Sequence, residues 1–170
     1  MAQPRIKSPH LLLASSNPHR LMTNLKHLLT TKSIKSINAE VERNVVALFR
    51  LGEHHLQFAR VTDMRDWRQR VSRFYYAGYN IKRSIALQVD GSFSTDSSDH
   101  STIDVLPKDF PDVATFGNRL KVLREDRNLA DYSHDSTQSE LVISQNDAEA
   151  FILRFADEAK NYLRARGVNL

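Results

Sequence analysis

Apolar side chains recur every three or four residues along four long stretches of the chain, which is the spacing of one buried face of an α-helix. The clearest helix is predicted from about Arg65 to Val89, with the stripe Trp67, Val71, Phe74, Gly78, Ile81, Ile85 and Val89. The same spacing predicts a helix from about Asn38 to Val61, one that begins near Pro111 and one from Ser144 to Arg166. A shorter series from His19 to Thr31 predicts an accessory helix. Four amphipathic helices of this kind close into an up-and-down bundle.

These elements divide the chain into two parts. Residues 1–37 are predicted to hold an irregular, proline-bearing arm and the accessory helix, and residues 38–170 to form the helical domain. Between the second and third long helices, Asp90-Gly91 ends one helix, and a loop rich in Ser, Asp and Thr reaches Pro111. A loop of this length within one domain is often functional or mobile.

The loop carries four side chains that suit a metal ion or acid–base chemistry: Asp96, Asp99, His100 and Asp104. An EF-hand is excluded because no bidentate Glu stands at the twelfth position from Asp90. Ordinary solvated loop polarity is the favoured interpretation. His100 is the one residue of the loop that is retained as a candidate acid or base.

Composition supports a helical, single-domain protein. The 170 residues suffice for one sizeable core, and only 5 Gly and 5 Pro leave little material for a turn-rich all-β fold. The absence of cysteine excludes disulfides and thiolate metal sites and fits a reducing cytoplasm. Leu11–Ala14 is too short for a signal sequence or a membrane span. A net charge of +4 is compatible with an RNA partner.

Two further groups of side chains have a structural and a functional interpretation. The adjacent pair His54-His55 diverges by about 100° on a helix, which disfavours a shared metal ion and favours two exposed or half-buried imidazoles. Tyr75, Tyr76 and Tyr79 flank the stripe of the second long helix. They suit base stacking, but packing at the edge of the core with the hydroxyl in water is favoured.

The segment from Leu123 to His134 reads Leu-Arg-Glu-Asp-Arg-Asn-Leu-Ala-Asp-Tyr-Ser-His. On a continuous helix, Arg127 and His134 extend the apolar stripe that includes Val113, Phe116, Leu120 and Leu123. A stripe expected to meet another helix therefore ends in a cation and an imidazole. The structural alternative is an ion pair between Arg127 and Asp131, with His134 complementing the helix dipole.

A helix-borne arginine, a polar residue directly after it and a histidine a few positions on resemble the R-x(4–6)-H signature of HEPN domains. Here the motif is Arg127-Asn128-x5-His134, and the resemblance covers residues from about 40 to 167. Many toxins of the family read Arg-Asn-x-x-x-His-x-Tyr. This chain departs from them, with Tyr132 where that His stands and His134 where that Tyr stands.

The resemblance implies an all-α, HEPN-like four-helix bundle and a homodimer through the third long helix, with the motif helices lining a shared cleft. It also implies metal-independent RNA cleavage, in which the ribose 2′-hydroxyl attacks the adjacent phosphate. Arg127, His134 and Asn128 would be the catalytic residues. The supporting or substrate-binding residues would be Tyr132, Asp131, His100 and Arg124, and the resemblance implies neither a metal ligand nor a cofactor.

Three functions follow from the resemblance. The leading one is an endoribonuclease that serves as a toxin or effector in a bacterial toxin–antitoxin or anti-phage defence system. The alternative is a catalytically inactive HEPN-like module that binds a partner protein, such as a nucleotidyltransferase antitoxin or a larger defence effector. A third, less favoured function is a nucleotide- or RNA-binding subunit that does not cleave.

Overall fold

The computed structural model describes residues 17–91 and 97–170, and within these two ranges the chain forms helices and no β-strand. The α-helices are α2 (Pro18–Asn24), α3 (Thr31–Val61), α4 (Trp67–Asp90), α5 (Val113–Tyr132) and α6 (Gln145–Arg164), and the two 3₁₀ helices are η1 (Ser97–Thr102) and η2 (Gln138–Glu140). The predicted all-α class is confirmed. Among the helices described, none is long and apolar enough to cross a membrane.

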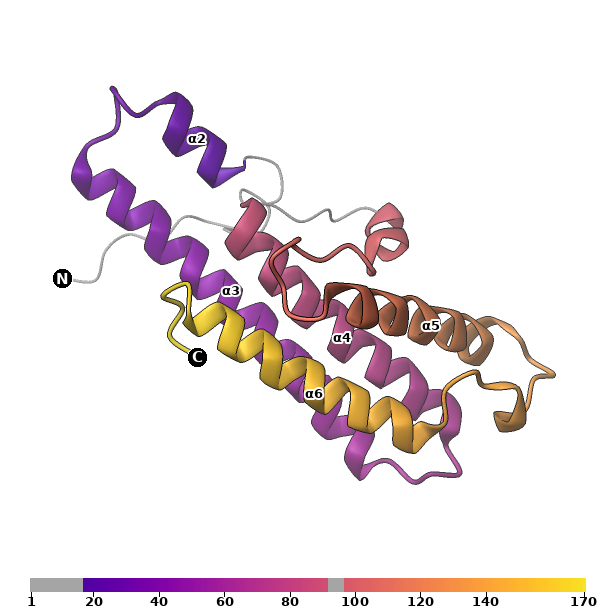
Figure 1. Cartoon of the computed structure of the whole chain (residues 1–170). Helices are drawn as coiled ribbons and strands as arrows, with labels where there is room; N and C mark the ends of the chain where they lie inside the picture. The colour runs from indigo at the N-terminus through magenta and orange to yellow at the C-terminus, as the bar shows by residue number, and fades with distance from the viewer. Residues whose placement is uncertain (1–16, 92–96) are drawn as a thin grey trace.

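Helix α4 lies at the centre of the arrangement and packs against α3, α5 and α6. The chain reverses direction between α3 and α4 and again between α5 and α6, so the four long helices lie side by side (Figure 1). Direct contact between α5 and α6 is much less extensive than the contact of either helix with α4. The side chains that face α4 therefore decide where α5 and α6 lie.

Large apolar side chains from all four long helices form the core, among them Phe49, Phe74, Phe116 and Phe155, which are fully buried. Gly78 on α4 sets the distance between the helices. A Cβ atom at this position would lie 2.9 Å from Leu120 Cδ2 and 3.0 Å from Ile152 Cδ1. The missing side chain lets α5 and α6 approach α4 closely, which brings the C-terminal half of α5 against the tyrosines of α4.

Helix α3 begins at Thr31, earlier than the predicted start near Asn38. The side chain of Thr30 accepts a hydrogen bond from the backbone N–H of Ser33 at 3.1 Å and caps the first turn. Ile34 and Ile37 then continue the apolar spacing into the helix. The expected connection before Asn38 is therefore helical, and the predicted domain boundary after residue 37 falls inside α3.

The other long helices agree with the predicted ranges to within a few residues, and α2 ends earlier than expected, at Asn24. Gly91 follows α4 with φ = 69°, the left-handed conformation expected of a glycine that ends a helix. Most of the predicted N-terminal arm (residues 1–16) and Asp96 of the acidic loop lie outside the described residues.

Candidate functional site

Arg127 lies on the face of α5 that packs against α4, and three tyrosine rings surround its guanidinium group. The guanidinium carbon is 5.4, 5.6 and 5.0 Å from the ring centroids of Tyr75, Tyr76 and Tyr132. Nη2 donates a hydrogen bond to the hydroxyl of Tyr76 at 2.9 Å. The Arg127 side chain is 12% exposed, so its charge lies at the edge of the core and not in bulk water.

The remaining guanidinium contacts are local to α5. Nε of Arg127 lies 2.7 Å from a carboxylate oxygen of Asp131, and Nη1 donates to the side-chain oxygen of Asn128 at 3.1 Å. The ion pair expected from the four-residue spacing is therefore present. Burial lowers the pKa of Arg127, but the hydrogen bond to Tyr76 and the neighbouring Asp131 outweigh burial and raise it. Arg127 is a permanent, fixed cation.

His100 lies beside the same tyrosines. Nδ1 is 2.5 Å from the hydroxyl of Tyr75, and the imidazole stacks on the ring of Tyr79 with centroids 4.4 Å apart. The ring of Tyr76 meets His100 edge-on at 6.4 Å. Burial and the positive charge of Arg127 together lower the pKa of His100 below its usual value, against the opposing effect of Asp99. Both effects favour the neutral form of the imidazole.

Two acidic-loop residues thus have structural partners, and the favoured interpretation of solvated loop polarity is wrong for both. Asp99 is buried, accepts a hydrogen bond from the Tyr79 hydroxyl at 2.8 Å and lies 3.5 Å from Nε of Arg83. His100 is half-buried. The same contacts refine the interpretation of the tyrosines: Tyr75 and Tyr79 do pack in the core, and their hydroxyls form hydrogen bonds with His100 and Asp99.

Arg124 is one turn before Arg127 on α5 and holds the loop in place. Its Nη1 donates to the backbone carbonyls of His100 at 3.3 Å and Ser101 at 3.0 Å. Arg124 therefore fixes the turn that presents the His100 imidazole to Tyr75. Its expected role in substrate binding stays a prediction.

A second imidazole lies near Tyr76 on the side of α3. The ring centroid of His55 is 5.6 Å from that of Tyr76, and Nη1 of Arg73 lies 3.2 Å from Nδ1 of His55. Because an arginine only donates hydrogen bonds, Nδ1 accepts, and the neutral imidazole carries its proton on Nε2. Burial, then Arg73 and His54, lower the pKa of His55. His54 is exposed and His55 half-buried, as predicted.

His134 lies outside α5, which ends at Tyr132. The expectation that Arg127 and His134 share one helical stripe is therefore wrong. Arg68 on α4 explains why the helix ends there. Its Nη1 donates hydrogen bonds to the carbonyls of Ala130 at 2.8 Å and Ser133 at 2.6 Å. Its Nη2 donates to the carbonyls of His134 at 3.3 Å and Ser136 at 2.8 Å. These bonds satisfy the carbonyls at the helix end and hold the chain in a turn.

The side chains after the end of α5 are open to solvent. His134 is exposed, and within the described ranges no hydrogen bond or ion pair joins its imidazole to Arg127. Tyr132 is 71% exposed and touches the site only through the guanidinium of Arg127. The structure thus brings together Arg127, Asn128, Asp131 and His100 and leaves the His134 side chain apart from them.

Tyr76 contacts Arg127 directly, and His55 lies against the other side of the Tyr76 ring. The sequence analysis favoured a structural interpretation of both residues and did not place them at the site. Both contact the cluster from helices that are distant from α5 in sequence, so no local spacing indicates them. Among the described residues, no group of three or more His, Asp or Glu side chains is placed to hold a metal ion.

Comparison with known proteins identifies no relative of this chain. No protein-family model matches the chain, and no curated protein or solved structure is significantly similar to it.

Proposed function

We propose that this chain is an HEPN-like, metal-independent endoribonuclease whose reaction centre is the cluster of Arg127, Tyr76 and His100. One observation carries the proposal: a permanently charged guanidinium is fixed by a hydrogen bond to Tyr76 within the group of tyrosines that also holds the neutral imidazole of His100. Cleavage of RNA by its own 2′-hydroxyl needs a fixed cation for the phosphorane and a base that is unprotonated near neutral pH.

Each member of the cluster has a defined task in this reaction. His100 accepts the proton of the 2′-hydroxyl through Nε2 in the tautomer whose Nδ1–H donates to the Tyr75 hydroxyl. The 2′-oxygen then forms a bond to phosphorus as the bond to the 5′-oxygen breaks, and the 5′-oxygen leaves with a proton from solvent or from an imidazole. Arg127 stabilises the charge on the non-bridging oxygens. The products end in a 2′,3′-cyclic phosphate and a 5′-hydroxyl.

Tyr76 joins the cation to the substrate in this proposal. Its hydroxyl oxygen accepts from Arg127, so its own proton remains for a phosphate oxygen. The side-chain oxygen of Asn128 accepts a hydrogen bond from Nη1 of Arg127 and keeps the guanidinium from rotating. Asp131 balances part of the cation's charge from the opposite edge. Tyr132, exposed beside the guanidinium, offers a ring on which a base can stack.

The position of His134 favours a second candidate function. Its side chain lies in the turn after α5, away from the contacts of Arg127, and the spacing of the family's signature is shifted in the same place. A catalytically inactive HEPN-like module that binds a partner protein, such as a nucleotidyltransferase antitoxin, is consistent with that position. An RNA cleavage assay distinguishes the two functions, because only the enzyme cleaves RNA.

The proposal extends to assembly and biological role through the same resemblance. We expect a homodimer that uses α5 and places two copies of the cluster along one cleft, and a role as a toxin or effector in a bacterial toxin–antitoxin or anti-phage defence system. Light scattering at tens of micromolar protein tests the assembly. A strictly monomeric protein would contradict the shared cleft.

The function is tested by incubating the purified protein with a structured RNA in the presence of a strong chelator. The proposal predicts fragments that end in cyclic phosphate, and it predicts that a 2′-deoxy or 2′-methoxy sugar at the cut site blocks cleavage. Wild-type protein without activity would support the binding module. Cleavage of DNA, or activity that requires added magnesium, would contradict the proposed chemistry.

A further inference from the structure

His55 and Arg73 form a polar pair on the α3 side of Tyr76, and the proposed cleavage reaction assigns no task to either. His55 belongs to α3 and Arg73 to α4, two helices that lie side by side (Figure 1). The imidazole of His55 packs on the ring of Tyr76, with an angle of 32° between the two planes. Because the Tyr76 hydroxyl bonds Arg127, the pair lies next to the proposed reaction centre.

Arg73 carries a charge that no carboxylate balances. Its guanidinium carbon lies 4.8 Å from the ring centroid of Phe58, and its Nη1 lies 3.2 Å from Nδ1 of His55. Within the described ranges, none of the ion pairs includes Arg73. An aromatic ring and a neutral imidazole offset only part of a positive charge, so this half-buried cation still attracts an anion that reaches the same face.

His55 presents its proton to solvent. Its Nδ1 accepts from Arg73, so the proton of the neutral imidazole is on Nε2. Nε2 has no hydrogen-bond partner in the described part of the chain, and it is not among the polar atoms that the protein encloses. Arg73 therefore fixes the tautomer of His55. The result is a neutral N–H donor that is held beside a cation and has no acceptor of its own.

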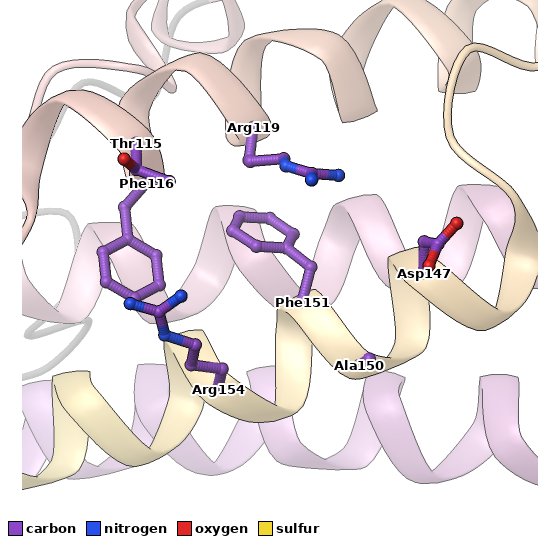
Figure 2. A pocket seen from close by; sticks show the side chains of 7 residues that line it. All are labelled: Thr115, Phe116, Arg119, Asp147, Ala150, Phe151 and Arg154. Atoms are coloured by element: carbon purple, nitrogen blue, oxygen red, sulfur yellow. The ribbon is translucent and has the colours of Figure 1, made fainter.

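The groove between α5 and α6 lacks this combination. Figure 2 shows Arg154 beside Phe116, and the guanidinium carbon lies 5.1 Å from the centroid of that ring. Phe116 is a core residue, and Arg154 is paired with Asp112 at 3.3 Å. Arg154 therefore resembles Arg73 in its stacking on a phenylalanine but differs from it in having a carboxylate partner. This difference makes Arg154 a suitable control.

We propose that His55 and Arg73 bind a phosphate of an RNA strand, next to the phosphate that Tyr76 and Arg127 contact. The inference rests on the proposed function for the identity of the ligand, because the strand that reacts at Arg127 continues to a neighbouring phosphate. Nε2–H of His55 donates to a phosphate oxygen, and the guanidinium of Arg73 supplies the charge. The strand thus crosses Tyr76 and contacts α5 on one side and α3 on the other.

Binding of a short 2′-methoxy RNA tests the inference without cleavage, because this RNA lacks the nucleophile. Fluorescence anisotropy measures the Kd. His55→Ala and Arg73→Met should each raise the Kd about tenfold, the expected effect of losing one hydrogen bond to a charged group. His55→Gln should bind nearly as tightly as the wild-type protein, because the glutamine amide keeps an N–H donor near the position of Nε2. A purely structural role of the imidazole would not be rescued in this way.

Two control variants separate this contact from general charge and from changes in α3. Arg154→Met removes a guanidinium that also lies over a phenylalanine ring, and His54→Ala removes the exposed imidazole next to His55. Both should bind the RNA as the wild-type protein does. A loss in Arg154→Met as large as that in Arg73→Met would contradict a specific contact.

A series of 2′-methoxy RNAs, each with one neutral methylphosphonate in place of a phosphate, identifies the contact. At one linkage, the replacement should weaken binding to the wild-type protein about tenfold and should have no further effect on His55→Ala. At the neighbouring linkage, the effect should instead disappear in Arg127→Ala. Nitrogen NMR of the wild-type protein adds a test without substitution: Nδ1 of His55 should be unprotonated, and addition of the RNA should shift the Nε2 signal.

The outcomes distinguish this inference from the proposed function. Cleavage of RNA by a protein whose RNA binding does not depend on His55 or Arg73 would overturn the inference and leave the nuclease in place. RNA binding that depends on both residues, in a protein that does not cleave, would support the inference and contradict the nuclease. Failure of the wild-type protein to bind the RNA at all would overturn the inference.

Discussion

The hydroxyl of Tyr76 on α4 accepts a hydrogen bond from Nη2 of Arg127 on α5, with the two atoms 2.9 Å apart. This bond fixes the cation against a neighbouring helix, and it leaves the phenolic proton of Tyr76 as a donor. A phosphate oxygen that meets the site would therefore contact a charge and a neutral donor whose positions are set before it binds. Preorganised donors of this kind are a main source of transition-state stabilisation.

Tyr76→Phe removes the donor and keeps the ring. We expect the rate of RNA cleavage to fall by about 10²-fold, the usual effect of removing one donor to a developing oxyanion. The rate is measured under single-turnover conditions with an end-labelled RNA. Tyr162→Phe is the matched control, because the Tyr162 hydroxyl bonds Asp109 at 2.8 Å, at the end of α6 and away from the cluster. Equal losses in the two variants would contradict a role for Tyr76.

Protonation of His55 and His100 should destabilise the fold. Burial is the largest cause that lowers the pKa of each imidazole, and Arg73 and Arg127 respectively add positive charge nearby. The unfolded chain therefore binds more protons than the folded chain just below the ordinary histidine pKa, so the free energy of unfolding decreases as the pH falls through that range. Urea unfolding at pH 7 and pH 5.5 measures the decrease.

The matched control for this pH dependence is the double variant His55→Gln, His100→Gln. Without the two buried imidazoles, the free energy of unfolding should change less between pH 7 and pH 5.5 than it does in the wild-type protein. His54→Gln should leave the dependence as it is, because His54 is exposed. An unchanged slope in the double variant would show that the two imidazoles are not protonated more easily in the unfolded chain.

Arg68→Met should loosen the turn after α5. The variant loses all the hydrogen bonds from the guanidinium to the carbonyls of residues 130, 133, 134 and 136 and keeps an apolar stem. Amide hydrogen exchange in residues 130–136 should become faster. Arg65→Met is the control, since Arg65 is exposed and forms hydrogen bonds with the carboxylate of Asp63, two residues before it in the chain. Unchanged exchange in Arg68→Met would mean that other contacts hold the turn.

Asp126→Ala should weaken the start of α6. The buried carboxylate accepts hydrogen bonds from the backbone N–H of Val142 at 2.8 Å and of Ile143 at 3.0 Å. Their loss leaves backbone donors without a partner and should lower the free energy of unfolding by about 2 kcal/mol. Chemical denaturation measures the change, with Glu125→Ala, at the exposed neighbouring position, as the control. Equal stability of the two variants would contradict this account.

The sequence predicted the all-α class and the approximate ranges of the long helices because both depend on spacing within a segment. The end of α5 is different. The apolar stripe and the Arg-Asn motif favour a helix that continues to His134, but Arg68, which lies far away in the sequence, takes the carbonyls and ends it. A contact of this kind leaves no mark on the local pattern.

The sequence predicted only part of the candidate site, because only some of its contacts lie within one segment. The ion pair of Arg127 and Asp131 follows from spacing on one helix. The contacts of Arg127 with Tyr76 and of His100 with Tyr75 join segments far apart in the chain. His100 was retained as a candidate only by its residue type in a polar loop, and neither its burial nor its lowered pKa follows from the sequence.

The most direct test of the central claim compares single-turnover cleavage of RNA by the wild-type protein, Arg127→Ala, His100→Ala and His134→Ala, with circular dichroism to verify that each variant is folded. We predict that the wild-type protein cleaves, that the first two variants lose activity by about 10²- to 10⁴-fold, and that His134→Ala keeps most of it. Undiminished cleavage by His100→Ala, or loss of cleavage in His134→Ala alone, would contradict the account and return the catalytic role to the histidine of the signature.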